Sequence, residues 1–159
     1  MKKLLAVFCC VISIQFASAQ SIQTAAVNDV DKAILPTYDN LIKILRMPGS
    51  TFLTTMANFN YIRHTPNENE YRAQNSDEIY SVTKDDKQVD IFFSADTKYP
   101  QATKDDFTAR FPGARHRLMD NGVEAYYFDL QDGSETLHYC ILFDITKEGG
   151  GGVTLLEVD

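Results

Sequence analysis

The sequence contains very little cysteine, and this limits the kinds of fold that it can adopt. Only 3 cysteines occur in 159 residues, and two of them, Cys9 and Cys10, lie close to the N-terminus. If that N-terminal stretch is removed on export, Cys140 remains alone and no intramolecular disulfide can form. The sequence therefore excludes a disulfide-stabilised scaffold. It predicts a domain that depends on an apolar core rich in Phe and Tyr.

The sequence also has no excess of positive charge. It carries 15 basic and 22 acidic residues, for a formal net charge of −7. Loss of Lys2 and Lys3 with the N-terminal stretch would leave 13 basic residues, and 13 − 22 gives a net charge of −9. Such a balance argues against binding to nucleic acid or to anionic membrane surfaces, and it is compatible with a basic protein partner.

After residue 19 the sequence has no apolar run that approaches the length of a membrane-spanning helix. The first 19 residues have the pattern of a secretory signal. Two lysines precede the apolar stretch Leu4–Ile14, and Ala17-Ser18-Ala19 supplies a small-residue cleavage site. We therefore expect a signal peptide over residues 1–19. A single periplasmic or secreted domain without a membrane span would follow over residues 20–159.

The common metal-binding and catalytic motifs are also missing. The sequence contains no C-x-x-C, no H-E-x-x-H and no EF-hand order of acidic residues, so no cofactor and no metal site are expected. His138 and Cys140 are the one pair to consider, because a strand would place them on one face with Cα atoms about 7 Å apart. A thiolate–imidazole pair could act as a nucleophile or supply two metal ligands. The alternative is a buried, inert cysteine beside a hydrogen-bonded histidine.

The clearest structural signal is the alternation of residue types over residues 136–145. Every odd position from Leu137 to Ile145 is apolar, whereas the even positions are mixed. A period of two predicts a strand with one face in a core. Strands are predicted over residues 88–95, 123–130 and 136–146, with further extended segments at 61–64, 71–72, 79–83, 115–119 and 153–158. Asn121-Gly122 predicts a type I′ hairpin, in which both turn residues have positive φ.

Apolar residues at helical spacing predict the helices. One helix is expected from about residue 37 to 46, after a short helical turn that begins near Asn28 and is interrupted by Pro36. Ser50 would cap a second helix that runs to about residue 59. Thr103 would cap a third that runs to residue 111, with acidic residues in its first turn. These elements predict an α+β domain in which helices pack on one face of an antiparallel sheet.

An internal similarity suggests that the domain consists of two diverged helix-plus-meander repeats. A shift of 52 positions aligns residues 48–64 with residues 100–116 and gives 6 identities in 17 positions. The same shift places residues 88–95 over residues 140–147. The predicted repeats span about 48–99 and 100–159. This layout resembles that of β-lactamase-inhibitor-like proteins. The resemblance, which is one of layout without a shared motif, implies a concave sheet that is presented to a protein partner.

Aromatic residues suggest where a partner could bind. If Val89 and Ile91 face the helices, Phe92 faces the opposite way, and the neighbouring residues Tyr126 and Tyr127 must lie on different faces. We predict that Tyr80, Phe92 and one of Tyr126 or Tyr127 lie on an open sheet face and anchor a protein partner. A second small core under the loops is the alternative. Acidic turn residues would frame this surface, namely Asp85, Asp86, Asp129, Asp132 and Glu135.

These features favour an exported, non-enzymatic binding protein of the inhibitor or immunity type. It would engage a protein partner through an aromatic sheet face with an acidic rim. The alternative is a small secreted hydrolase or metal-dependent enzyme that uses His138 and Cys140. That enzyme could also use the two Arg-His pairs, Arg63-His64 and Arg115-His116, which would bind one anion between them.

Overall fold

A computed structural model describes residues 21–26, 32–66, 69–74, 80–94, 98–146 and 150–159. The signal peptide predicted over residues 1–19 lies outside these residues. Two short strands come first, β1 (Thr24–Ala26) and β2 (Lys32–Ile34), followed by helices α1 (Tyr38–Leu45) and α2 (Gly49–Asn58). The remaining elements are β3 (Tyr61–Arg63), β4 (Glu70–Ala73), β5 (Tyr80–Lys84), β6 (Gln88–Phe93), α3 (Lys98–Arg110), β7 (Arg115–Leu118), β8 (Glu124–Asp132), β9 (Glu135–Ile145) and β10 (Gly151–Val158).

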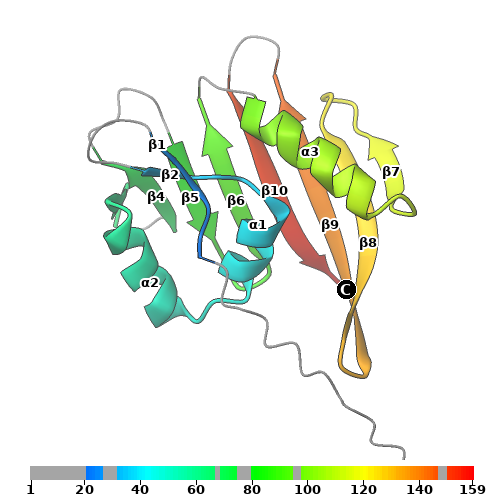
Figure 1. The fold of residues 1–159 in the computed structure, drawn as a ribbon, viewed down its shortest axis with the longest axis horizontal. Coiled ribbons are helices and arrows are strands. Elements are labelled where there is room, and N and C mark those ends of the chain that lie inside the picture. The colour runs from blue at the N-terminus through cyan, green and yellow to red at the C-terminus, as the bar shows by residue number, and fades with distance from the viewer. Residues whose placement is uncertain (1–20, 27–31, 67–68, 75–79, 95–97, 147–149) are drawn as a thin grey trace, which may run out of the picture.

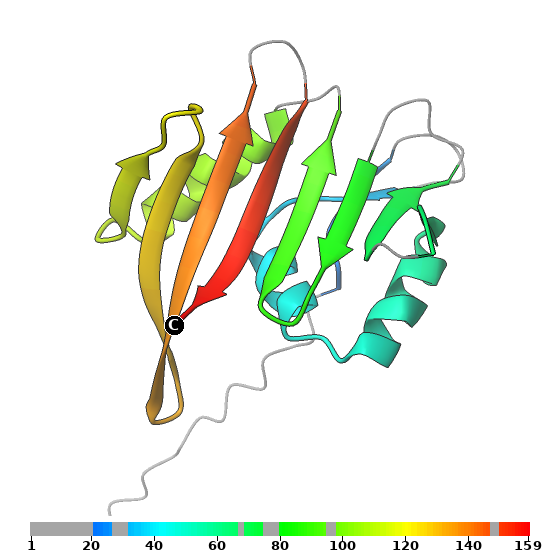
Figure 2. The ribbon, with the colours of Figure 1, turned by 180° about the vertical axis from the view of Figure 1, so that it is seen from behind.

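An eight-stranded antiparallel sheet spans the protein in the order β3-β4-β5-β6-β10-β9-β8-β7. The helices α1, α2 and α3 and the small β1–β2 sheet all lie on one face of it, as Figure 1 shows. The opposite face carries no helix in the described part of the chain (Figure 2). The predicted α+β class, with helices on one face of an antiparallel sheet, is therefore confirmed. None of the described helices is long and apolar enough to cross a membrane.

The chain order divides the sheet into two halves. Helix α2 is followed by β3 to β6 and helix α3 by β7 to β10, and the two halves meet where β6 pairs with β10. The repeat itself is not confirmed. The predicted 52-residue shift lays β6 on β9, yet β6 is the fourth strand after its helix and β9 is the third. The two halves therefore cannot be aligned with one constant shift.

A cluster of aromatic rings under α3 forms one half of the core. Phe107, which is fully buried, lies within 6.0 Å, centroid to centroid, of five other rings. These rings belong to Tyr38, Phe111, Tyr126, Phe128 and Phe143. The other buried side chains of α3 are Pro100 and Thr103, and this i, i+3, i+7 spacing defines the face that packs on the sheet.

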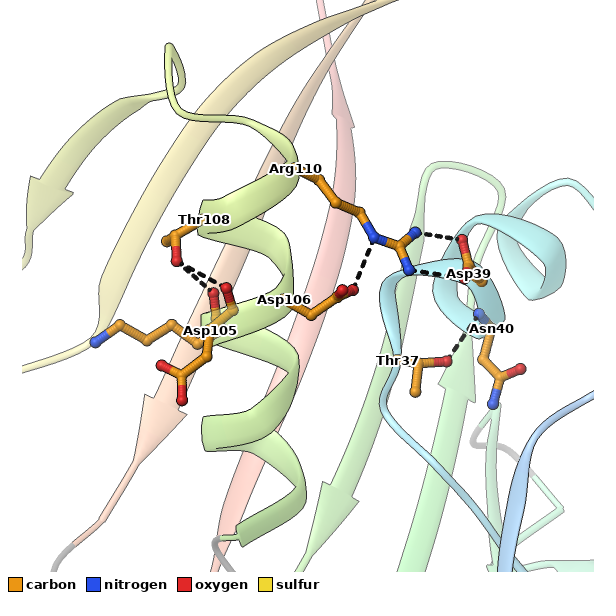
Figure 3. Close-up of polar contacts among 8 residues, drawn as sticks. Thr37, Asp39, Asn40, Asp105, Asp106, Thr108 and Arg110 are labelled. Carbon is orange, nitrogen blue, oxygen red and sulfur yellow. Dashed lines mark hydrogen bonds and ion pairs between the residues drawn. The ribbon is translucent and has the colours of Figure 1, made fainter.

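Polar contacts fix α3 against the start of α1 (Figure 3). The Arg110 guanidinium donates to both carboxylate oxygens of Asp39 at 2.9 and 3.3 Å, and its Nε lies 2.9 Å from Asp106. The Thr37 side chain accepts from the Asn40 backbone N–H and caps α1. Because the charged groups are partly exposed, we attribute positioning rather than most of the stability to these ion pairs.

Three local predictions need correction. Lys32–Ile34 is a strand rather than a helical turn, because it pairs with Thr24–Ala26 and the Ile34 N–H donates to the Tyr61 hydroxyl; residues 28–31 lie outside the described part. Helix α3 starts five residues before Thr103, since proline is tolerated in a first helical turn. Thr103 is therefore buried inside the helix and caps nothing.

The third correction concerns the β7–β8 turn. Gly122 has a φ of 87°, but Asn121 does not have positive φ, so the turn is not type I′. The Gly122 N–H donates to the Met119 carbonyl and the Met119 N–H to the Val123 carbonyl, which defines a three-residue loop with glycine in the left-handed position. The hairpin predicted at this position is present with one more residue in its loop.

Candidate functional site

The uncovered sheet face carries a group of apolar side chains, which we call the open-face patch. Its members are Phe92, Tyr127, Leu142, Leu156 and Val158, and they come from strands β6, β8, β9 and β10. The register places Leu156 opposite Cys140, Cys140 opposite Tyr127, and Thr154 opposite Leu142, so these side chains lie on neighbouring strands of one face. All five are partly exposed, and Phe92 is 37% exposed. An antiparallel sheet face in water would normally be polar at such positions.

A glycine gives Phe92 its place on this face. Gly152 lies directly opposite Phe92 on β10, and a Cβ atom at Gly152 would lie only 3.2 Å from Cδ2 of the Phe92 ring. The ring therefore leans over the glycine, where no side chain interferes. This arrangement holds a partly exposed aromatic ring close to the sheet surface, as a recognition anchor requires.

A groove of about 660 Å³ adjoins the patch where β7 begins, beside β8 and β9 and at the end of β10. Its lining includes Arg115, Tyr127, Asp129, His138 and Val158. The Arg115 guanidinium carbon lies 4.9 Å from the centre of the Tyr127 ring, a cation–π contact. His138 Nδ1 lies 2.8 Å from Asp129 Oδ1 across the β8–β9 pair. The groove thus offers an aromatic surface, a guanidinium and a His–Asp pair to a ligand.

One predicted aromatic anchor, Tyr80, is misplaced, and of the pair Tyr126 and Tyr127 it is Tyr127 that lies on the open face. Tyr80 is buried against the helices, because it pairs with Phe93 in the sheet and therefore shares its face; the two ring centroids are 4.9 Å apart. Tyr126 also lies on the helix side, where its hydroxyl donates to Glu124 at 3.0 Å. Burial raises the pKa of Tyr126 to about 12, and the bond to Glu124 adds to this effect. Of the four, Phe92 and Tyr127 lie on the open face.

The predicted acidic residues all lie toward one end of the sheet. Asp85 and Asp86 belong to the β5–β6 turn, and Asp132 and Glu135 flank the β8–β9 turn. Figure 2 shows both turns at the same end of the sheet, at the bottom of the view. Two of the predicted acidic residues have a basic partner. Asp132 lies 3.4 Å from Arg46, and Asp129 is engaged by His138. Asp132 and Glu135 share the helix-side face of Phe128 and Tyr139, so at this turn only Asp129 lies on the open face. The predicted acidic frame is therefore incomplete here, and its role in binding stays a prediction.

The geometry does not assemble the enzyme that the sequence left open. His138 and Cys140 do share a face, but Cys140 is buried and His138 contacts Asp129 instead of the thiol. Burial raises the pKa of the Cys140 thiol, although a hydrogen bond with Tyr127 opposes the shift, so the reactive thiolate is disfavoured. In the part of the chain that the structure describes, no three His, Cys, Asp or Glu residues are grouped to hold a metal ion.

The two Arg-His pairs cannot bind one anion. Arg63 lies in β3 and Arg115 in β7, and these strands are the opposite edges of the eight-stranded sheet. Seven strand spacings separate them, which is roughly 34 Å. Their matching sequence does not bring them together, since each opens the meander of its own half.

Cys140→Ser should lower the free energy of unfolding by about 1 kcal/mol, because the thiol fills space as a small hydrophobic group on the patch floor. Urea unfolding of both proteins measures this change. In the folded wild type, a thiol reagent should react with Cys140 far more slowly than in urea. Equal reaction rates in the folded and unfolded protein would contradict the buried position of the thiol.

Sequence reasoning missed Leu142, Leu156 and Val158 as surface residues, and it assigned Arg115 to a shared anion site rather than to this groove. One signal was available. The even positions of residues 136–145 include the apolar residues Cys140 and Leu142, although a sheet face in water is expected to be polar. Comparison of the chain with protein-family models, with curated proteins and with solved structures gave no match. Function must therefore be inferred from the open-face patch and the groove themselves.

Proposed function

We propose that this chain is an exported, non-enzymatic binding protein of the inhibitor or immunity type, which engages a protein partner through the open-face patch. The observation that carries the proposal is a group of partly exposed apolar side chains on a sheet face that no described helix covers. Tyr127, Leu142, Leu156 and Val158 gather on β8, β9 and β10, and Phe92 lies beyond the Thr154–Asp90 pair. Contiguous exposed apolar surface with a polar rim is typical of protein–protein interaction sites.

The chemistry of the patch favours a protein over a small molecule. Phe92 and Tyr127 supply aromatic area, and the aliphatic residues Leu142, Leu156 and Val158 gather near Tyr127, while Thr154 and Asp90 separate them from Phe92. Such centres contribute most of the affinity in protein interfaces when a surrounding rim excludes water. The rim at the β5–β6 and β8–β9 turns is acidic, so basic groups on the partner would complement it.

The test compares variants of the patch with a matched control. Phe92→Ala should weaken binding of the native partner, isolated by pull-down from the host, by about 30-fold, which corresponds to about 2 kcal/mol. The variant should keep nearly all of its stability, because Phe92 is partly exposed and its ring lies over the surface. Leu156→Lys should abolish binding by placing a charge in the centre of the patch.

Leu53→Ala is the control. Leu53 is an exposed apolar residue of α2, on the helix side of the molecule, and is 53% exposed. Its removal should leave the dissociation constant of the partner unchanged, as measured by calorimetry. If the partner binds all three variants as tightly as the wild type, or loses affinity only for the Leu53 variant, the open-face patch is not the binding site.

A further inference from the structure

The edge of the sheet next to the groove is incomplete. Strand β7 pairs with β8 only from Arg115, opposite Tyr127, to Leu118, opposite Glu124. Strand β8 continues to Asp132, and over residues 128–132 no described strand pairs with its outer side. Figure 2 shows the β8–β9 hairpin extending beyond the rest of the sheet. A strand that continued the line of β7 would complete this edge.

The backbone of β8 presents hydrogen-bonding groups at this edge. The β8–β9 hairpin has a two-residue turn, Gly133, with a φ of 63°, and Ser134. In such a hairpin the pair that closes the turn, here Asp132 and Glu135, is hydrogen-bonded. Alternation along the strand then directs the N–H and C=O groups of Asp129 and Gln131 away from β9. The bond from the Met119 N–H to the Val123 carbonyl gives the same alternation from the β7 side.

Side chains of an added strand would find two different surfaces. Residues opposite Phe128 and Leu130 would point to the helix side, toward the apolar ring of Phe111. The residue opposite Asp129 would point to the open face, beside a carboxylate that is 62% exposed. The groove of about 660 Å³, which is lined by Phe111, Gly113 and Asp129 among others, provides the room for them.

We propose that the partner contributes an extended segment that adds to the sheet as a strand antiparallel to β8 along residues 128–132. The segment carries alternating apolar and basic side chains, with the apolar ones toward Phe111 and Phe128 and a basic one beside Asp129. Main-chain hydrogen bonds to Asp129 and Gln131 supply affinity, and the alternation supplies specificity. This proposal rests on the proposed function, since it specifies how the same partner reaches the groove beside the open-face patch.

A capped octapeptide of alternating Lys and Val is the probe, and the same peptide with Glu in place of Lys is its control. We expect the Lys-Val peptide to slow amide hydrogen exchange at Asp129 and Gln131 by about tenfold or more. Chemical-shift changes in the labelled protein should be confined to β8 and the groove. The Glu-Val peptide should bind at least about tenfold more weakly. Unchanged exchange at both amides in saturating Lys-Val peptide would overturn the proposal.

Gln131→Pro removes the outward N–H without breaking a bond to β9, so proline is tolerated there as on an edge strand. It should weaken peptide binding by about tenfold or more, whereas Gln131→Ala, which keeps the N–H, should bind like the wild type. Equal losses in the two variants would show that the side chain, and not the backbone, is responsible, and would refute strand addition. The exchange measurement on the wild type decides the matter independently if the proline variant does not fold.

The native partner separates this proposal from the proposed function. If Leu156→Lys abolishes its binding and Gln131→Pro leaves it unchanged, the open-face patch is correct and strand addition is wrong. If neither variant affects the partner, both proposals fail. Self-association of the chain through the β8 edge, seen by sedimentation without peptide and abolished by Gln131→Pro, would also refute a partner segment.

Discussion

Phe107→Ala should lower the free energy of unfolding by about 4 kcal/mol, a large share of the roughly 5–15 kcal/mol that keeps an ordinary domain folded. Phe107 is fully buried and is the largest buried side chain of α3, in contact with rings from α1, β8 and β9. Its loss would leave a cavity under a helix whose remaining buried side chains are only Pro100 and Thr103. The rest of α3 is largely polar and cannot compensate.

Urea unfolding followed by circular dichroism measures this effect. Phe92→Ala is the matched control, because it removes the same side chain from the uncovered face and should cost less than about 1 kcal/mol. Gln101→Ala, on the exposed side of α3, should cost less still. Equal losses for Phe107→Ala and Phe92→Ala would mean that the aromatic cluster under α3 does not form the core of this half of the protein.

The second large effect is a loss of stability at alkaline pH. Burial raises the pKa of both Tyr38 and Tyr126 to about 12, against an ordinary value near 10. A raised folded-state pKa means that the stabilising contribution is complete below pH 10 and is lost as the pH rises toward 12. Because one unit of pKa corresponds to about 1.4 kcal/mol, the two tyrosines together should cost on the order of 4 kcal/mol by pH 12.

Tyrosinate absorbance at alkaline pH follows the titration directly. Tyr38 and Tyr126 should titrate about two units later in the folded protein than in denaturant. Tyr38→Phe and Tyr126→Phe should each remove one late-titrating group and flatten the fall of unfolding free energy between pH 10 and 12. Titration of all eight tyrosines near pH 10 in a protein that is still folded would contradict the buried environment of both residues.

The regular elements could be predicted from the sequence because their signals are local. The strands expected over residues 88–95, 123–130 and 136–146 correspond to β6, β8 and β9, and the helices expected near residues 37–46 and 50–59 correspond to α1 and α2. The repeat period of apolar side chains and the identity of turn residues involve only a few neighbouring positions. Both signals can therefore be recognised in a single sequence. Lys32–Ile34 escaped prediction since its conformation depends on pairing with Thr24–Ala26 and on the Tyr61 hydroxyl.

Which face of each strand meets the helices was decided only by the tertiary structure. Alternation shows that Tyr80 and Val82 share a face, and that Tyr126 and Tyr127 do not, but it does not identify the face that is covered. Tyr80 lies on the covered face because it pairs with Phe93, and Tyr126 lies there because its ring packs against Phe107 under α3. The sequence alone thus determined that aromatic and acidic residues were present in excess, and only packing selected Phe92 and Tyr127 for the open face.

The free edge of β8 shows the same division most clearly. The residues of Glu124–Asp132 predict a strand, and that conclusion needs nothing beyond the segment itself. Whether the N–H groups of Asp129 and Gln131 face a neighbour depends on where β7 begins, and the path of Phe111 to Ala114 from α3 sets that point. Strand formation is encoded by side-chain pattern over neighbouring residues. Which strands pair with β8 depends on the distant segments that lie on each of its sides, and these positions are set only when the whole chain folds.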